Sequence, residues 1–425
     1  MSTNTPRVMV LDGDFDNAIQ VATEVSTDLD ATVIGVGTTE RSRLLCSRHC
    51  DVAATVAVSG DGYSEALLSA VREHRPDVVV PVGYDSMTAI DSVRDRLPQD
   101  VNCCLPSSSS LATAVDKRRT LALASRLGID TPADFTEAVA AAERSPDAVR
   151  DLPYPVFLKA RHECGGNVTA VVQEPRSFWP TYDDLAETAD DDVLVQEYID
   201  DDRTYGCGVL FMDGSLQMLF EHEERRSVPR QGGSGTRVRI FRDPELEAAS
   251  LELLRALDWN GFALAEFKRR PDGSFVLMEV NPKLWASYAL ASQSGYRFVS
   301  TMVVRSLDLP WRGPVEPSQT GEMVFPLREL NFALTDANES LVRSGLSMLW
   351  PPARWDVNFR DFRSWFTPPA GDAAAERDSA EAGSGTSDER AVPAGANAEG
   401  SDRGDAADDA SIPGFPHIHL RTDHE

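Results

Sequence analysis

The stretch FALAEFKRRPDGSFVLMEVNPK, residues 262–283, decides the fold expected for this chain. Two apolar runs flank the turn sequence RRPDG, a pattern typical of a β-hairpin. Neighbouring strands then bring Glu266 near Glu279, and Asn281 projects from the same face as Glu279 because side chains alternate along a strand. Two carboxylates and an amide oxygen on one face predict a Mg²⁺ site that also binds nucleotide phosphates.

A solvated acidic hairpin is the plainer interpretation of the same residues, because the chain has 68 acidic and 41 basic side chains and a net charge of -27. However, Glu279 and Asn281 are embedded in the apolar run FVLMEVNP, which favours a position inside the protein. We therefore interpret the hairpin as a metal site.

Lysine is rare in this sequence: Lys117, Lys159, Lys268 and Lys283 are its only examples among 41 basic residues. Lys159 ends the strand-like PVFLKA and precedes RHECGGN, a run with small residues whose backbone amides can approach phosphates. Lys117 stands at a helix start in AVDKRRTL. A compact ammonium contacts phosphate oxygens as a point charge, so these lysines and the acidic hairpin together indicate a nucleotide site.

The pattern of elements divides the chain into regions. Up to about residue 110, β-branched runs at 8–11, 32–36 and 78–82 alternate with helical segments at 15–29, 62–75 and 84–97, which predicts a doubly wound parallel α/β domain. Later strand signals interrupted by helices predict α+β lobes with antiparallel sheets. Residues 371–410 are rich in Ala, Gly, Ser, Asp and Glu, so this segment is predicted to be disordered.

In the order of these motifs the chain resembles the ATP-grasp superfamily, close to its carbamoyl-phosphate-synthase-like members, over about residues 7–310. Lys117, PVFLKA, the small-residue loop, VQEYI, AEF and MEVNPK carry the resemblance. It implies a pre-ATP-grasp doubly wound α/β domain, a two-lobed ATP-grasp fold and a disordered acidic tail. The implied bounds are 1–112 for the first domain, 113–192 and 193–320 for the two lobes, 321–366 for a small extension and 367–425 for the tail.

The resemblance also implies roles for individual residues. Nucleotide contacts fall on Lys117, Lys159, Gly165, Gly166, Gln196, Glu197, Tyr198, Ile199 and a ribose-binding acid at Asp200 or Asp202. The lysines meet the phosphates, the glycines form a loop over them, and residues 197–199 meet adenine through backbone groups. One or two Mg²⁺ ions would be held by Glu266, Glu279 and Asn281.

Two further positions carry implied roles in the reaction. Lys283 stands where the family usually has an arginine that stabilises phosphoryl transfer, so the charge is kept but the bidentate geometry is lost. The segment 223–246 borders the acceptor site in the resemblance, and Arg230, Arg237 and Arg239 are its candidates for holding an anionic substrate. A loosely ordered β-hairpin with solvated charges is the alternative interpretation of that segment.

The function implied is an ADP-forming ligase of the carboxylate-amine type, with ATP and Mg²⁺, or Mn²⁺ in its place, as cofactors. ATP would convert a carboxylate into an acyl phosphate that an amine or other nucleophile then attacks. A non-catalytic ATP-binding sensor or scaffold is the alternative, which Lys283 keeps open. A dehydrogenase is remote, because LDGDF after the first strand signal lacks GxGxxG.

Charge and composition bound the partners. A net charge of -27 disfavours nucleic acid and anionic membranes, so we expect small-molecule carboxylate and nucleophile substrates, with a homodimer as the assembly to test. The acidic, lysine-poor composition resembles proteins of a salt-adapted cytoplasm, although a GC-rich coding bias gives a similar pattern. The first residues show no signal-peptide pattern, and we expect a cytoplasmic location.

Overall fold

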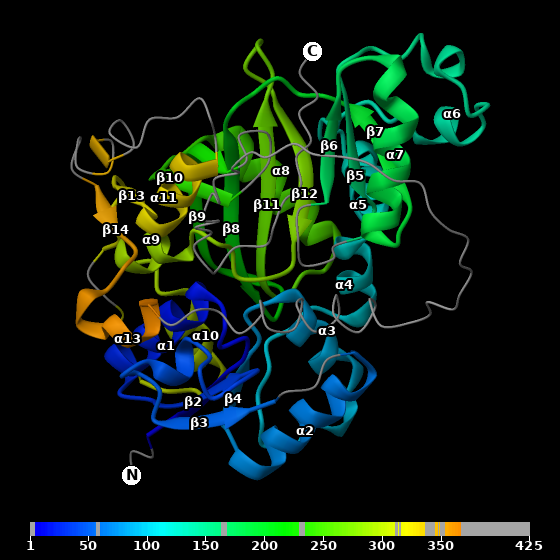
Figure 1. Cartoon of the computed structure of the whole chain (residues 1–425). Helices are drawn as coiled ribbons and strands as arrows, with labels where there is room; N and C mark the ends of the chain where they lie inside the picture. Colours follow the sequence, from blue (N-terminus) through cyan, green and yellow to red (C-terminus); the bar gives the residue numbers. More distant parts are fainter. Residues whose placement is uncertain are drawn as a thin grey trace, which may run out of the picture.

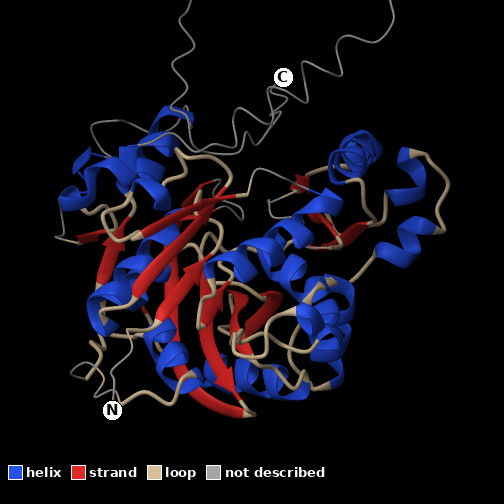
Figure 2. Ribbon diagram, turned by 90° about the horizontal axis from the view of Figure 1, so that it is seen from below, coloured by secondary structure: helices blue, strands red, loops and turns tan. Residues whose placement is uncertain are grey.

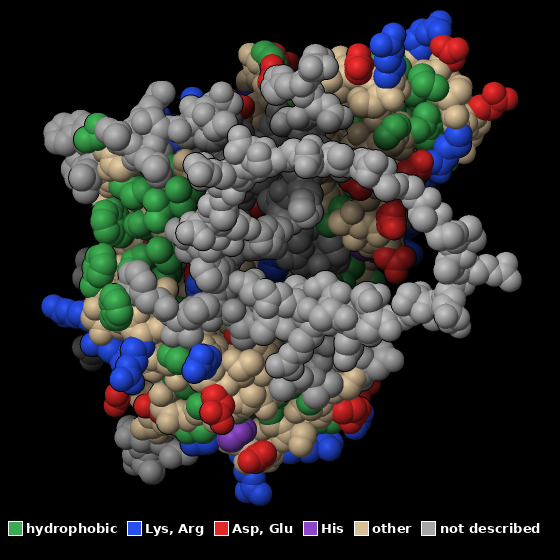
Figure 3. Space-filling view, in the orientation of Figure 1, with side chains coloured by type: hydrophobic (Ala, Val, Ile, Leu, Met, Phe, Trp, Pro, Cys, Tyr) green, Lys and Arg blue, Asp and Glu red, His purple; other side chains and the backbone are tan. Residues whose placement is uncertain are grey.

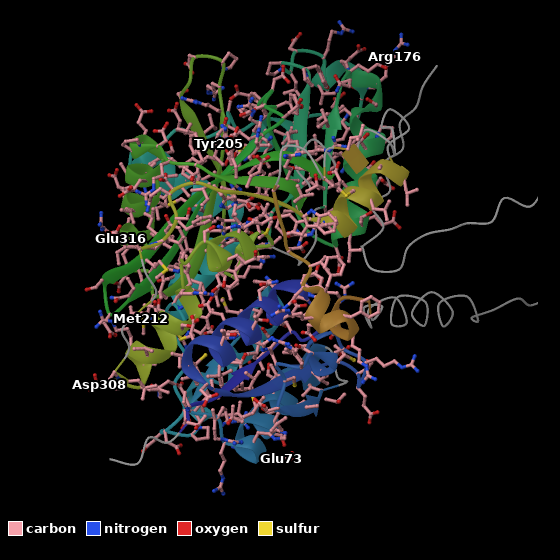
Figure 4. All side chains as sticks on the ribbon, turned by 90° about the vertical axis from the view of Figure 1, so that its left-hand side faces the viewer. Glu73, Arg176, Tyr205, Met212, Asp308 and Glu316 are labelled. Carbon is pink, nitrogen blue, oxygen red and sulfur yellow. The ribbon has the colours of Figure 1, made fainter. Side chains whose placement is uncertain are left out.

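The computed structural model describes residues 5–56, 60–162, 168–228, 234–310, 313, 316–335, 345–346, 348 and 353–366. These residues form three bodies, each built on one sheet (Figure 1). Arg176 at the start of α7 (Pro175–Ala189) and Glu73 near the end of α2 (Tyr63–His74) mark opposite ends of the molecule in Figure 4. No helix in the described part is both long and apolar enough to cross a bilayer.

The first body is a parallel α/β unit, as the alternation of strands and helices predicts. Its sheet runs in the order β3-β2-β1-β4, with each neighbouring pair parallel. The sequence does not predict β3, because VAAT is short and contains two alanines, which have low β propensity. The elements are β1 (Arg7–Val10), α1 (Asp16–Leu29), β2 (Thr32–Gly37), β3 (Val52–Thr55), α2, β4 (Val78–Val80) and α3 (Tyr84–Ser92).

Two short helices follow the first body, and the second begins at Lys117, as the sequence predicts. Helix α4 (Ser108–Val115) ends at Asp116, whose extended backbone separates it from α5 (Lys117–Arg126). The Asp116 carboxylate accepts hydrogen bonds from the backbone amides of Arg118 and Arg119, at 3.1 and 3.2 Å, and so caps α5. This break sets the position of Lys117.

The second body is a small antiparallel lobe. Its strands β5 (Val156–Ala160), β6 (Thr169–Val172) and β7 (Val193–Glu197) run in the order β6-β5-β7. Helices α6 (Thr136–Ala140) and α7 belong to the same lobe, and Phe178 of α7 is fully buried in its core. Figure 2 shows the short strands of this lobe set apart from the long strands of the third body.

The third body is a seven-stranded sheet in the order β12-β11-β8-β9-β10-β13-β14. The segment at 223–246, for which a loosely ordered β-hairpin was the alternative interpretation, contributes to two antiparallel strands on either side of residues 229–233 and to the start of the helix that follows. The elements are β8 (Thr204–Met212), β9 (Ser215–Val228), β10 (Ser234–Ile240), α8 (Pro244–Ala256), β11 (Gly261–Arg269), β12 (Phe275–Asn281), α9 (Tyr288–Gln293) and α10 (Phe298–Ser306).

The chain after residue 320 completes the edge of this sheet. Strand β13 (Glu322–Val324) pairs with β10, and β14 (Arg354–Trp355) pairs with β13. Two helices, α11 (Pro326–Thr335) and α13 (Phe362–Phe366), belong to the same part of the chain. Figure 3 shows hydrophobic side chains gathered on the left, where β13 and β14 lie in Figure 1. The predicted disordered tail, residues 367–425, lies outside the described residues.

A buried carboxylate joins the first and third bodies. Glu24 of α1 is 1% exposed and accepts hydrogen bonds from the hydroxyls of Tyr288 and Ser292, each at 2.6 Å. It also accepts from the backbone amides of Val299 and Ser300, at 3.0 and 2.9 Å, in the first turn of α10. These four bonds compensate its burial and hold α1 against α9 and α10 (Figure 1).

A second buried carboxylate gives a stability prediction. Burial raises the pKa of Asp356 to about 7, with Arg328 opposing the shift and Asp16 adding to it. The folded state then binds more protons than the unfolded chain between about pH 4 and pH 7, so Asp356 makes the protein less stable as the pH rises through that window. We expect Asp356→Asn to raise the free energy of unfolding at pH 8 by roughly 2–4 kcal/mol.

Urea unfolding at pH 8 and pH 4 measures this effect. The two proteins should differ at pH 8 and differ little at pH 4, where Asp356 is protonated in the folded state and about half protonated in the unfolded chain. A less stable Asp356→Asn protein at pH 8 would show instead that attraction between the ionised carboxylate and Arg328 dominates.

Candidate functional site

Lys117 is the first residue of α5, and the contacts of this helix start fix its position. Asp116, which caps the helix, is also held by Arg161, whose Nη2 and Nε lie 2.7 and 3.1 Å from its oxygens. The Lys117 amide donates to the Arg161 carbonyl at 3.0 Å, and its Nζ donates to the His162 carbonyl at 3.4 Å. Helix α5 is thereby fixed to the end of β5, which carries the second lysine.

Lys159 lies on β5 and is only 3% exposed. Its Nζ donates to the Met278 carbonyl on β12 at 2.9 Å, so it reaches from the small lobe to the seven-stranded sheet. Burial lowers the pKa of Lys159 to about 8, Lys117 acts in the same direction, and Glu279 opposes the shift. A buried ammonium whose one hydrogen bond within the described ranges goes to a backbone carbonyl is suited to an anionic ligand.

The acidic hairpin has the geometry that the sequence predicts. Glu266 on β11 is directly opposite Glu279 on β12, and Asn281 follows on the same face. Asn281 is 8% exposed and donates to Glu279 Oε1 at 3.1 Å. Lys117 Nζ lies 3.7 Å from Glu279 Oε2. The Lys117 ammonium and the side-chain oxygens of Glu266, Glu279 and Asn281 therefore meet at one end of the hairpin.

Electrostatics keep Glu279 ionised. Burial acts to raise the pKa of Glu279, but Lys117, Lys159, Lys283 and the hydrogen bond from Asn281 hold that pKa below its usual value. Lys283, which follows β12, is half-buried and close enough to take part in this effect. An ionised carboxylate is the form that ligates a cation.

The donor set fits Mg²⁺ bound together with a nucleotide. Across the described ranges, no three His, Cys, Asp or Glu side chains form a metal cage. Mg²⁺ is usually held by one or two carboxylates plus substrate phosphates and water, so Glu266, Glu279 and the Asn281 amide suffice.

The strand leading out of the small lobe carries a buried acceptor without a donor. Gln196 of β7 is 1% exposed, and its Oε1 has no hydrogen-bond partner among the residues that the structure describes. Such an atom is costly unless a ligand supplies a donor. An exocyclic amine such as that of adenine fits this need, so Gln196 supports the predicted adenine site. Ile199 is buried and Tyr198 half-buried beside it.

Glu197 has structural contacts that the sequence does not predict. Its backbone amide donates to the Ala133 carbonyl at 2.9 Å, so that amide is already used within the protein. Its carboxylate forms a bidentate pair with Arg270, with Nη2 to Oε2 at 2.9 Å. The hydrogen bond from Arg270 holds the pKa of Glu197 below its usual value. Glu197 thus ties β7 to the acidic hairpin, and contact with adenine through its amide is not supported.

Arg239 faces the side of the seven-stranded sheet opposite to that of Glu266. It lies opposite Glu223, which lies opposite Tyr205, which lies opposite Phe267, so all four face the same side of the sheet. Glu266 is one residue before Phe267 and points to the other side. Arg239 forms an ion pair with the fully buried Glu223. Arg239 therefore points away from Glu266, and this geometry does not support the catalytic role predicted for it.

The remaining predicted residues divide into paired, exposed and undescribed. Arg237 is paired with Glu322 of β13, which leaves it poorly suited to hold an anion. Asp202 is exposed in the turn after β7, where a ribose-binding acid is expected. Gly165, Gly166 and Arg230 lie outside the described residues.

Close packing beside Glu266 involves residues that the sequence does not single out. Gly206 lies opposite both Glu266 and His222, and an added Cβ there would stand 2.4 Å from the His222 ring. His222 Nε2 lies 3.2 Å from the Ser287 hydroxyl, and burial lowers its pKa to about 3, so the ring stays neutral. Gly206 is required because a side chain would displace this ring.

Comparison with known proteins agrees with this geometry. Residues 116–305 match the family model described as the carbamoyl-phosphate synthase L chain, ATP binding domain, and this range contains the lysines and the acidic hairpin. The propionyl-CoA carboxylase alpha chain of Mus musculus is 24% identical over 261 residues, which are 58% of this chain and 36% of that one. The carbamoyl phosphate synthase large chain, N-terminal section, of Methanopyrus kandleri is 23% identical over 53% of this chain and 42% of that one.

Solved structures share the fold. The biotin carboxylase of Campylobacter jejuni, solved as a β-γ-ATP complex, has a TM-score of 0.58 at 17% identity and covers 76% of this chain and 75% of that one. This chain spans less than half the length of the two curated relatives. Residues 116–305, which hold the acidic hairpin and the lysines, therefore match the ATP-binding domain of the carbamoyl-phosphate synthase L chain, in agreement with the ATP-grasp resemblance seen in the sequence.

Proposed function

We propose that this chain is an ATP- and Mg²⁺-dependent ligase that activates a substrate carboxylate as an acyl phosphate and joins it to an amine or other nucleophile, releasing ADP and phosphate. One observation carries the proposal: the positive charges of three lysines, Lys117, Lys159 and Lys283, lower the pKa of Glu279. Glu279 in turn lies opposite Glu266 and accepts a hydrogen bond from Asn281. Anion-binding cations beside a hard-oxygen metal site are what phosphoryl transfer from a nucleotide requires.

The residues of the chain divide the work. Lys117 and Lys159 would bind the phosphates, and Glu266, Glu279 and Asn281 would hold the metal. When bound, Mg²⁺ supplies charge that offsets the charge developing on the transferred phosphoryl group. Lys283 places a further positive charge at the same end of the hairpin. The substrate carboxylate must then approach on the face of the sheet that carries Glu266.

A product assay tests the proposal. The wild-type chain is incubated with ATP, Mg²⁺ and a panel of carboxylates, including bicarbonate, each with and without an amine, and nucleotides are separated by chromatography. We expect ADP and phosphate to appear only with the right carboxylate. Hydroxylamine should convert the acyl phosphate into a hydroxamate, and ¹⁸O in the carboxylate should appear in phosphate. Release of AMP and pyrophosphate would overturn the proposal.

The same assay separates the alternative of a non-catalytic ATP-binding protein. Lys283 at the position of the family arginine is the feature that favours it. Tight binding of Mg-ATP without ADP formation across the whole panel would support a sensor or scaffold. The Lys283→Arg variant separates the two hypotheses further. It should raise ADP formation if the site is catalytic, and it should leave ADP formation absent if the protein is a sensor or scaffold.

A further inference from the structure

The fourth lysine of the chain, Lys268, has no role in the site described so far. It lies on β11, two residues beyond Glu266, and is 8% exposed. Its Nζ donates to the backbone carbonyls of Asp201 and Arg203, at 2.6 and 3.3 Å. A lysine that could have pointed to solvent is thus buried, with its charge directed at one short turn.

That turn connects the two halves of the nucleotide site. Residues 200–203 follow the strand that carries Gln196 and lead into β8 of the seven-stranded sheet. The Asp201 carboxylate accepts from the Arg269 backbone amide through Oδ2 and from the Arg203 amide through Oδ1, each at 3.0 Å. The turn is therefore fixed to β11 by both the Lys268 side chain and the next residue's amide.

The charges around Lys268 match its burial. Burial lowers the pKa of Lys268, while Asp201, Asp202, Glu224 and Glu266 act to raise it. An ammonium kept out of water is stabilised only where carbonyls and carboxylates surround it, and this turn supplies both. Because the bonds end on backbone carbonyls, they fix the path of the main chain rather than the side chains of the turn.

We propose that Lys268 is a positioning residue for the nucleotide, which sets the separation between the adenosine-binding turn at 200–203 and the phosphate-binding hairpin of Glu266 and Glu279. This inference rests on the proposed nucleotide site. Lys268 touches neither half of the ligand. Lys268 holds the adenosine-binding turn and the phosphate-binding hairpin at the distance that one nucleotide can span. Its effect on affinity therefore appears only for a ligand that contacts both the turn and the hairpin.

Fragment binding distinguishes this role from a general structural one. Affinities for adenosine, Mg-tripolyphosphate and the non-hydrolysable analogue Mg-AMPPNP are measured by calorimetry on the full chain. We expect Lys268→Met to weaken Mg-AMPPNP by about 10- to 100-fold, since two bonds from a charged donor are lost. The affinities for the two fragments should change by less than about threefold. Lys268→Arg, which still donates to carbonyls, should recover part of the lost affinity.

Arg269→Met is the matched control, because that side chain donates to the Gly273 carbonyl at 2.8 Å and leaves the turn untouched. It should bind all three ligands like the wild type. If Lys268→Met does not fold, Asp201→Ala removes the other attachment of the turn and should show the same selective loss. An equal loss for all three ligands, or no loss, overturns the inference while the proposed function stands. A wild-type chain that binds no Mg-AMPPNP overturns both.

Discussion

Glu279→Gln is expected to lower kcat by about 10²–10³-fold while the protein keeps its fold. Lys117, Lys159 and Lys283 keep the Glu279 carboxylate ionised. We therefore expect its negative charge to be needed for binding the metal, and not for packing of the hydrophobic core. Glutamine preserves the shape and the bond with Asn281 but removes the negative charge that ligates the metal. Turnover in the ADP-release assay, with circular dichroism and thermal unfolding alongside, measures both parts of the expectation.

Glu221→Gln is the matched control for that variant. Glu221 is also a buried glutamate of the same sheet, but it lies opposite Cys207 and so faces the side away from Glu266. Its substitution should leave kcat within about twofold, as expected for a residue with no contact with the reacting groups. Loss of the folded state in Glu279→Gln would make the residue structural, and equal loss of kcat in both variants would contradict its placement at the metal.

Lys159→Met is expected to weaken Mg-ATP binding by about 30- to 100-fold, the effect of losing one charge-assisted contact to a phosphate. Lys159 is buried and reaches only a backbone carbonyl across the lobes, so its charge has no local carboxylate within ion-pair distance in the described contacts. Methionine fills a similar volume without the charge. Calorimetric titration with Mg-ATP, Mg-tripolyphosphate and adenosine measures the change.

The pattern across ligands decides the role of Lys159. A phosphate contact predicts losses for Mg-ATP and Mg-tripolyphosphate and an unchanged affinity for adenosine, which differs from the pattern expected for Lys268→Met. If adenosine weakens equally, Lys159 would support the shape of the lobe instead. Comparable affinity for every ligand would remove Lys159 from the site.

The hairpin at 262–283 can be predicted from the sequence because its geometry depends only on residues close to one another in the chain. The turn sequence joins the two strands, and alternation along each strand places Glu266, Glu279 and Asn281 on one face. The scarcity of lysine also marks Lys117 and Lys159 in the sequence alone. The helix start at Lys117 was also predicted, but the break at Asp116 that separates α4 from α5 was not.

Long-range pairing explains what could not be predicted. The face on which Arg239 lies depends on the register of β10, β9 and β8, and a shift of one residue would reverse it. The pair of Arg270 with Glu197 joins residues 73 apart in sequence, with no pattern that relates them. Lys268 stands out in the sequence as a rare residue, but its carbonyl partner at Asp201 lies 67 residues away in sequence, and no local pattern relates the two.

The bonds of Glu24 bear on how this chain can be shortened. A polypeptide beginning near residue 113 would retain the ATP-binding domain but lose α1, and with it the acceptor for the hydroxyl of Tyr288 and for two amides that open α10. Those donors would be left in an apolar surface newly open to water. The first body is thus a partner in the folding of the ATP-binding domain, and we expect an isolated fragment of residues 113–320 to require a substitute surface to remain monomeric and folded.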